Sequence, residues 1–251
     1  MTFFMMTLYQ EEKMKSQTLN LLKKEIKLGN GAQTICWTIC CFCMYFIPNY
    51  PMYVGPFYIL LCVMMTFAMN QSSHDILYTV LLPVKKSDVV KARFLYSGML
   101  EFFALACALV GGLVRYLVHY PANKAGIEIG ICYFGLQLIL LALFNLIYLG
   151  NVYKDPLKSG LKFLFSAIAY FIGMAVCELP VWTYFAMKGK LEAGEINQLP
   201  VLGKLGMIFI SHDSQYIIPQ LGILAAGILI YVLGWYLSFR RGSCQFDKYD
   251  M

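Results

Sequence analysis

The sequence has little charge for its length. Only 14% of the 251 residues are Asp, Glu, Lys or Arg, whereas 59% are hydrophobic. Water-soluble domains have about 25% charged and about 45–50% apolar residues. A soluble fold of this size cannot bury so much apolar surface, so the lipid bilayer must be the solvent for most of the chain.

Motifs for enzyme chemistry are also missing. The three histidines, His74, His119 and His212, show no HExxH or other zinc-ligand spacing. No G-x-S-x-G nucleophile turn occurs, and no P-loop of the form G-x-x-x-x-G-K-[ST] that would hold a nucleotide phosphate. The sequence therefore predicts no catalytic residue, no metal ligand and no cofactor bound by this chain.

The nine cysteines do not form a disulfide or zinc pattern. Eight lie inside apolar runs, and Cys244 lies in the tail. There is no CxxC…CxxC pair, and a metal cluster at Cys40-Cys41-x-Cys43 is the less favoured reading. We interpret the cysteines as small apolar residues of membrane helices.

Six apolar runs are long enough to cross a bilayer, which takes about 17–25 helical residues. They are 32–49, 52–70, 95–118, 127–149, 161–186 and 216–239. These runs predict an all-α polytopic protein of one domain, 1–251. Its parts are a basic tail with an interfacial helix (1–31), the six-span bundle (32–239) and a tail (240–251). Met14 is an alternative start to Met1, because MKSQTLNLLKKEIKLG looks like a self-contained beginning.

Basic residues are concentrated in every second connection between the predicted spans. The N-terminal tail, the 2–3 and 4–5 connections and the C-terminal tail hold 15 of the 20 Lys and Arg residues, and the other connections hold 5. Cytoplasmic loops carry an excess of Lys and Arg, so both termini are predicted to be cytoplasmic.

Residues 17–28, QTLNLLKKEIKL, have helical amphipathic spacing. One side carries Leu19, Leu22 and Ile26, with Leu21 and Leu28 beside them, and the other carries Lys23, Lys24 and Lys27. We expect this helix to lie on the anionic inner leaflet, and a solvated basic tail is the alternative. The 187–215 connection holds an apolar stretch, LPVLGKLGMIFI, too short to span; it is re-entrant, interfacial or packed on the outer surface.

Charged residues inside spans are candidate functional groups. Glu101 either pairs with a basic side chain near the cytoplasmic face or takes part in coupling or transport. Glu178 lies just before Pro180, which breaks the backbone ladder. It either makes a structural hydrogen bond or serves an outer gate. Headgroup contact or snorkelling is expected for Arg115 and His119.

Methionine and aromatic residues recur along two of the predicted spans, and we call these two sets the soft rows. They are Phe57, Tyr58, Met64, Met65, Phe67 and Met69 on the second, and Phe163, Phe165, Tyr170, Phe171 and Met174 on the fifth. Helix packing explains such rows, and a cavity wall for apolar cargo is the alternative. On that alternative, Met65, Met69 and Phe171 join Glu178 and Pro180 in a candidate cargo path or gate.

The segment between the second and third runs is half apolar and half basic. Ser72-x-x-Asp75 has the form of a capping box, and the apolar positions after it predict a helix over 73–82 that Pro83 ends. Ser87 is predicted to cap a second helix, with Asp88 in its first turn. A helix of about ten residues is roughly 15 Å long and cannot span. Its apolar face must dock on the inner leaflet or on a separate cytoplasmic protein.

The stretch HDILYTVLLPVKKSDVVKARFL resembles the cytoplasmic segment of ABC-2 type transporter permeases. It is most similar to a bacterial six-span group that includes exporters of phenol-soluble modulins. The pattern is carried by Leu82, Pro83, Val84, Lys85, Lys86, Asp88, Val89, Val90, Lys91, Arg93 and Phe94. The basic entry helix, six spans and long 5–6 connection agree with that layout.

The resemblance implies a mechanism. Two permease chains, identical or paralogous, form a pore in the bacterial plasma membrane, and each docks on a separate ATPase subunit that binds ATP and Mg. The short helix is the coupling helix that fits the ATPase. Its expected contact residues are Asp75, Ile76, Leu77, Tyr78, Leu81, Leu82, Pro83, Lys85, Lys86 and Asp88. The expected cargo is an amphipathic peptide or another apolar molecule, and no nucleic acid is expected as a partner.

Other classes of function are less well supported. A polytopic membrane enzyme would need a catalytic constellation, and a stand-alone secondary transporter would need more intramembrane charge. A membrane sensor or scaffold subunit is the third alternative. An adjacent gene for a P-loop ATPase would separate the transporter permease from these.

Overall fold

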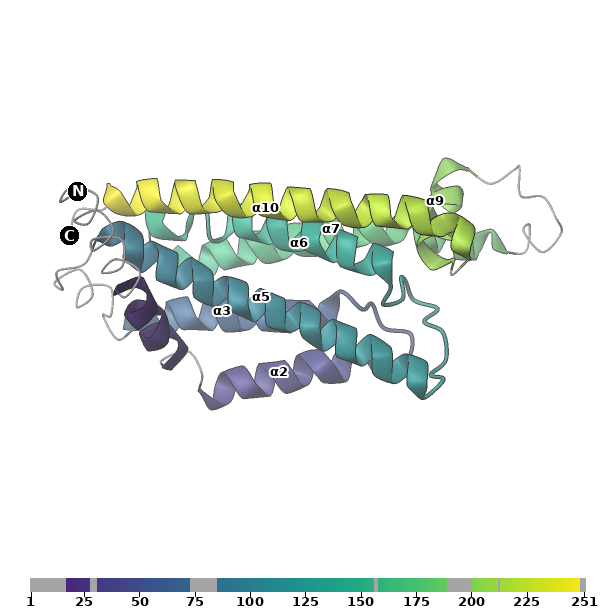
Figure 1. Ribbon diagram of the computed structural model, residues 1–251, viewed down its shortest axis with the longest axis horizontal. Coiled ribbons are helices and arrows are strands. Elements are labelled where there is room, and N and C mark those ends of the chain that lie inside the picture. Colours follow the sequence, from purple (N-terminus) through teal and green to yellow (C-terminus); the bar gives the residue numbers. More distant parts are fainter. Residues whose placement is uncertain are drawn as a thin grey trace, which may run out of the picture.

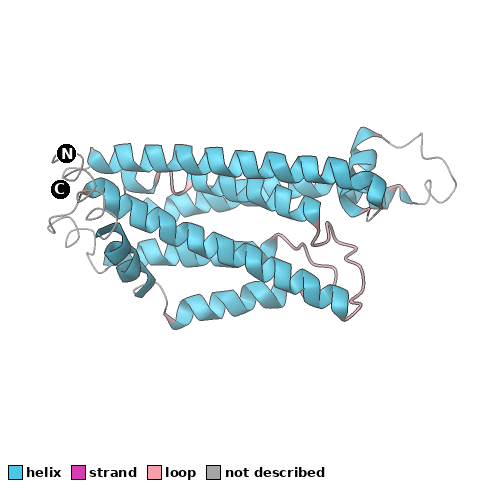
Figure 2. Cartoon of the chain, viewed as in Figure 1, coloured by secondary structure: helices cyan, strands magenta, loops and turns pink. Residues whose placement is uncertain are grey.

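The computed structural model describes residues 17–27, 31–72, 85–155, 158–188, 200–211 and 213–248, and this part of the chain consists of helices and connecting loops (Figures 1 and 2). Residues 17–27 form the first helix. The others are α2 (Ala32–Met44), α3 (Val54–Ser72), α5 (Lys86–Leu117), α6 (Ile131–Ile147), η1 (Val152–Lys154), α7 (Ser159–Ala186), α9 (Val201–Ile210), η4 (Ser214–Tyr216) and α10 (Ile217–Asp247).

Within the described residues, four helical stretches are long and apolar enough to cross a membrane. They are Lys86–Leu117, Ile131–Lys154, Ser159–Ala186 and Ile217–Asp247, with shorter apolar helices at Ala32–Met44, Val54–Met69 and Val201–Ile210. Many large apolar side chains on these helices face outward, for example Phe102 on α5 and Leu229 on α10. An apolar exterior is what lipid requires, so the prediction of an all-α membrane protein is confirmed.

The long helices lie side by side in an elongated bundle (Figure 1). One end, here the basic end, comprises residues 17–27, 85–93, 152–155, 158 and 240–248. The other, here the loop end, comprises residues 45–53, 118–130, 200–211 and 213–216. The segment 73–84, which contains the predicted coupling helix, lies outside the described residues.

Helix α2 is shorter than the run 32–49 suggested. It ends at Met44, and the chain turns through Tyr45 to Tyr53, with Asn49 in the left-handed region at φ 53°. Pro48 and Pro51 explain the early end, because proline cannot donate to the helix ladder and restricts the residue before it. The turn therefore lies short of the loop end of α5 (Figure 1).

Helices α6 and α10 make the closest contact in the bundle core. A Cβ on Gly227 would collide with the carbonyl of Gly135, and one on Gly135 would lie 2.8 Å from the carbonyl oxygen of Ile223. Small residues let membrane helices approach at backbone distance, where van der Waals contact is the main attraction. This contact fixes α10, whose other faces are largely exposed, against α6.

Helix α9 packs on the loop end of α7. A Cβ on Gly206 would collide with the carbonyl of Pro180, so the two backbones touch. The apolar stretch of the 187–215 connection therefore packs against the bundle, and its depth in the membrane stays a prediction.

Candidate functional sites at the two ends of the bundle

The basic end begins with the first turn of α5, where three of the predicted coupling residues lie. Lys85 is the N-cap residue and Lys86 the first helical residue, so the prediction that Ser87 caps this helix is wrong. The backbone of Lys85 is extended (ψ 137°), and its carbonyl already accepts the Asp88 amide over 2.9 Å, so the helix begins directly after Lys85. Asp88 does lie in the first turn, where its charge suits the helix dipole. It is buried, with Lys91 Nζ 3.3 Å from its Oδ1.

A buried ion pair joins the first helix to α5. Arg93 Nε donates to Glu25 Oε1 over 3.2 Å, and the two side chains are only 2% and 4% exposed. The Arg93 guanidinium carbon also lies 5.9 Å from the ring centroid of Phe67 on α3. The pair therefore ties together the first helix and both helices that flank the segment 73–84.

Sequence reasoning missed Glu25 in this role. The 17–28 stripe placed Leu19 on the lipid side, and its exposure of 55% agrees with such a position. The positions buried against the bundle are Leu21 and Glu25. These two are four residues apart, which places them on one helical face. An acidic residue on the apolar side of a basic helix was the available signal.

Aromatic rings surround the ion pair and connect it to the rest of the bundle. Phe67 lies edge-on to Tyr148 at 5.7 Å and to Tyr153 at 6.0 Å between ring centroids. Tyr153 in turn meets Phe246 of α10 at 5.3 Å. Edge-to-face contacts of this kind add to the energy of apolar burial. Phe67 of α3 therefore contacts the end of α6 and, through Tyr153, α10.

Glu101 lies in the middle of the bundle, and within the described residues its partners are neutral side chains rather than a basic one, which corrects one of the two expectations. Its Oε2 accepts hydrogen bonds from Asn145 Nδ2 over 3.1 Å and from the Tyr231 hydroxyl over 2.7 Å. The residue is 1% exposed. Neutral donors from α6 and α10 thus satisfy one carboxyl oxygen, and a role in transport stays a prediction.

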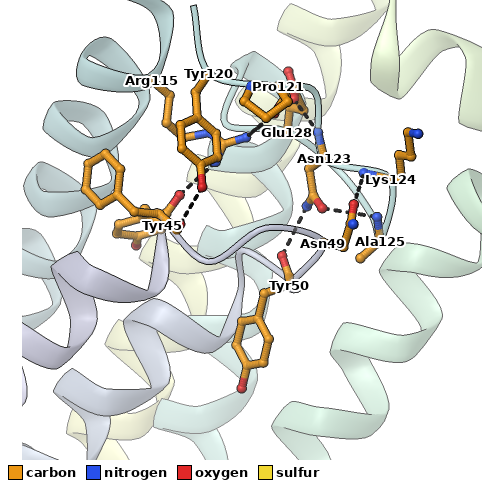
Figure 3. A network of polar contacts seen from close by, with 11 residues as sticks. Tyr45, Asn49, Tyr50, Arg115, Tyr120, Pro121, Asn123, Lys124, Ala125 and Glu128 are labelled. Atoms are coloured by element: carbon orange, nitrogen blue, oxygen red, sulfur yellow. Dashed lines mark hydrogen bonds and ion pairs between the residues drawn. The ribbon is translucent and has the colours of Figure 1, made fainter. Parts of the chain in front are cut away.

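At the loop end, Arg115 is buried rather than extended toward headgroups, so the snorkelling prediction is wrong for this residue (Figure 3). Its Nη1 donates to the carbonyl of Tyr45 over 2.8 Å, and its Nη2 to the carbonyl of Pro121 over 3.1 Å. The guanidinium lies 4.5 Å from the Tyr120 ring centroid and 3.7 Å from Glu128 Oε1. Arg115 thus reaches the end of α2, where backbone carbonyls lack helical partners.

The segment 118–130 continues this contact along the α2–α3 turn (Figure 3). The Tyr120 hydroxyl donates to the carbonyl of Phe46 over 2.6 Å, and Asn123 Nδ2 donates to the carbonyl of Tyr50 over 3.1 Å. Unpaired backbone groups at membrane depth would cost several kcal/mol each. The segment is therefore a polar cap that makes the short α2–α3 hairpin tolerable.

Glu178 holds the same segment from the other side. Its Oε2 accepts the Ile127 amide over 2.9 Å, and the residue is fully buried. A Cβ on Gly126 would collide with this carboxylate, and Trp182 Nε1 donates to the carbonyl of Ala125 over 2.7 Å. The structural hydrogen bond that the sequence left open is therefore present. A role at a gate stays a prediction.

The other candidate cargo residues lie in different surroundings. Met65 and Met69 line a cavity of about 170 Å³ between α2 and α3. Phe171 packs against Phe57, with 4.6 Å between ring centroids, on the side of α3 that faces α7. Pro180 lies beneath α9. Their part in transport stays a prediction.

The fold and its buried contacts indicate the general class of this protein. Long apolar helices with apolar exteriors, joined inside by buried polar contacts, are those of a multi-pass membrane protein. Residues 20–240 match the family model described as ABC-2 family transporter protein, so the chain belongs to the ABC-2 transporter family. This confirms the resemblance to ABC-2 type permeases, and membership of the subgroup that includes phenol-soluble modulin exporters stays a prediction. Membership makes the chain a membrane transport component and implies an ABC ATPase partner and pairing of two permeases.

Searches of curated proteins and of solved structures gave no significant match.

Proposed function

We propose that this chain is the permease subunit of an ABC exporter. ATP, with Mg, is hydrolysed in a separate ATPase subunit, and the cargo is an apolar or amphipathic molecule such as an antimicrobial-type peptide. The single observation that carries the proposal is the family match over most of the chain. The sequence has no P-loop, which agrees with hydrolysis in a partner.

The proposed orientation has six spans and cytoplasmic termini in a bacterial plasma membrane. The apolar runs and the distribution of Lys and Arg support it. Lys85, Lys86, Arg240 and Arg241 all belong to the basic end, which then faces the cytoplasm and the ATPase. The loop end, with α9 and the polar cap, faces outward.

The proposed coupling site is the segment between α3 and α5. Its ATPase contacts are Asp75, Ile76, Leu77, Tyr78, Leu81, Leu82, Pro83, Lys85, Lys86 and Asp88. Support comes from the described residues on either side, because the buried Glu25–Arg93 pair and Phe67 join α3, α5 and the first helix. A force applied between α3 and α5 would therefore move three helices together.

The proposed cargo path uses the soft rows and ends at the loop end. Met65, Met69 and Phe171 are the candidate path residues, and Glu178 and Pro180 are the candidate gate. Support comes from the position of Glu178, which holds the outer segment through the Ile127 amide. The similarity to phenol-soluble modulin exporters supports an amphipathic peptide as cargo.

The decisive experiment is co-expression with a candidate ABC ATPase subunit. Replacing Leu77 and Leu81 by Asp should uncouple ATP hydrolysis from transport, because two charges would disrupt an apolar docking face. The matched control replaces Leu202 and Leu205 of α9, which are 48% and 38% exposed at the loop end, by Asp. The control should retain the ATPase. Normal co-purification and normal transport by the Leu77/Leu81 variant would contradict the proposal.

A further inference from the structure

A groove of about 440 Å³ opens between the first helix, α2 and α5. Ile26, Thr38, Tyr96 and Phe103 contribute to its wall. Its rim faces the membrane, because Phe103 is 47% exposed and the neighbouring Met99 is 49% exposed. The volume is within the range of about 300–1,000 Å³ typical of ligand sites.

The wall of this groove suits hydrocarbon. The Thr38 hydroxyl donates to the carbonyl of Thr34 over 2.8 Å, so it is already used within α2. The remaining wall is mostly aliphatic and aromatic carbon. A charged ligand would lose its hydration here, and the described lining residues offer no charged side chain in return.

Two lysines flank Ile26, the residue of the first helix that lines the groove. Lys23 lies one turn before Ile26 on the same flank of the first helix, and Lys27 follows Ile26 directly. Both lysines are exposed. The helix is held in place by the buried Glu25–Arg93 pair, so Ile26 and the lysines keep their positions relative to the groove.

We propose that this groove binds one acyl chain of an anionic phospholipid, with the phosphate lying against Lys23 and Lys27. The apolar wall selects the chain, and the lysines select the negative headgroup. A neutral lipid would contact only the apolar wall, and a soluble anion would contact only the lysines. The site does not depend on the cargo or on ATP hydrolysis.

The test measures lipid retained by the full chain in native mass spectrometry, after purification in an equal mixture of phosphatidylglycerol and phosphatidylcholine. The wild-type chain should retain one phosphatidylglycerol. Replacing Lys23 and Lys27 by Gln should reduce this retention about fivefold for each lysine. Lys204→Gln, an exposed lysine on α9, is the control and should retain the lipid.

A second arm fills the groove. Thr38→Phe should abolish retention, whereas Thr183→Phe should not, although Thr183 makes the same type of bond to the carbonyl four residues earlier, over 2.8 Å. Met99→Trp fills the groove from its exposed rim and serves if Thr38→Phe fails to fold.

Four outcomes would overturn the proposal. They are equal retention of both lipids, retention that survives both filling variants, retention unchanged in the lysine variants, and a change of oligomeric state on filling, which would assign the groove to a second copy of the chain.

Discussion

Arg93 and Arg115 lie on the same helix and are both buried, yet they hold different partners. They are 22 residues apart, which is about 33 Å along α5 and close to the thickness of the bilayer core. Arg93 forms an ion pair with Glu25 of a separate helix. Arg115 mainly binds backbone carbonyls at the end of α2 and in its own following segment.

The difference shows two ways of placing a guanidinium near the edge of a membrane. An ion pair depends on one other side chain, and removal of either member leaves the other charge buried. A carbonyl cap does not depend on the identity of the residues it binds, because every residue has a carbonyl. At the basic end, the Arg93 ion pair therefore joins α5 to the first helix. At the loop end, the Arg115 side chain joins α5 to the backbone of a turn.

The largest expected effect comes from breaking the ion pair. Arg93→Met should lower the free energy of unfolding by about 3–5 kcal/mol, because the buried Glu25 carboxylate loses its ion pair with Arg93. Thermal or denaturant unfolding in micelles measures this change. The double variant Glu25→Leu/Arg93→Met removes both charges and should recover most of the loss. An equal loss in the single and double variants would argue against a buried charge pair.

A smaller loss is expected at the other arginine. Arg115→Met should cost about 1.5–3 kcal/mol of unfolding free energy, because hydrogen bonds to the Tyr45 and Pro121 carbonyls are lost. Arg115→Lys should recover only part, since lysine lacks the planar fork that reaches two carbonyls. Complete recovery by lysine would mean that charge alone, and not geometry, matters at this site.

One hydroxyl of the polar cap tests a single carbonyl contact. Tyr120→Phe removes the 2.6 Å bond to the Phe46 carbonyl and should cost about 0.5–1.5 kcal/mol of unfolding free energy. Tyr116→Phe is the matched control on α5, because Tyr116 is 81% exposed, and its effect should stay within about 0.5 kcal/mol. Similar losses of unfolding free energy in the two variants would show that the Tyr120 hydrogen bond does not stabilise the fold.

The smallest stability effect is expected at Glu178. In Glu178→Gln the amide oxygen can still accept the Ile127 N–H, so the unfolding free energy should change by less than about 0.5 kcal/mol. Cargo release should nevertheless change, with ATPase binding intact, as a transport assay in proteoliposomes would show. Export at the wild-type level would leave Glu178 with its hydrogen bond alone.

Helix positions could be predicted from the sequence because apolar runs of sufficient length have few alternatives in lipid. Each of the six predicted runs contains a helix of the structure. The errors lie at ends that depend on local geometry. Helix α2 ends five residues early, and α5 begins at Lys86 rather than after Ser87. Such ends are decided by which backbone groups find partners, which periodicity does not encode.

The polar contacts could not be predicted in the same way. Arg115 binds a carbonyl 70 positions away in the chain, and Glu25 pairs with Arg93 across 68 positions. A hydropathy pattern shows that a charge is near an apolar run but not which group satisfies it. The positions of Arg115 and Glu101 were recognised from the sequence, whereas their partners required the fold.

The shortness of α2 has a consequence for the surrounding bilayer. Its 13 residues rise about 20 Å, against a hydrocarbon core of about 30 Å. This flank therefore presents a hydrophobic mismatch that the long helices α5 and α10 do not. Lipids beside α2 must tilt or shorten to cover it, at a cost of fractions of a kcal/mol per Å. The elastic strain of the membrane is thus concentrated on one flank of the molecule.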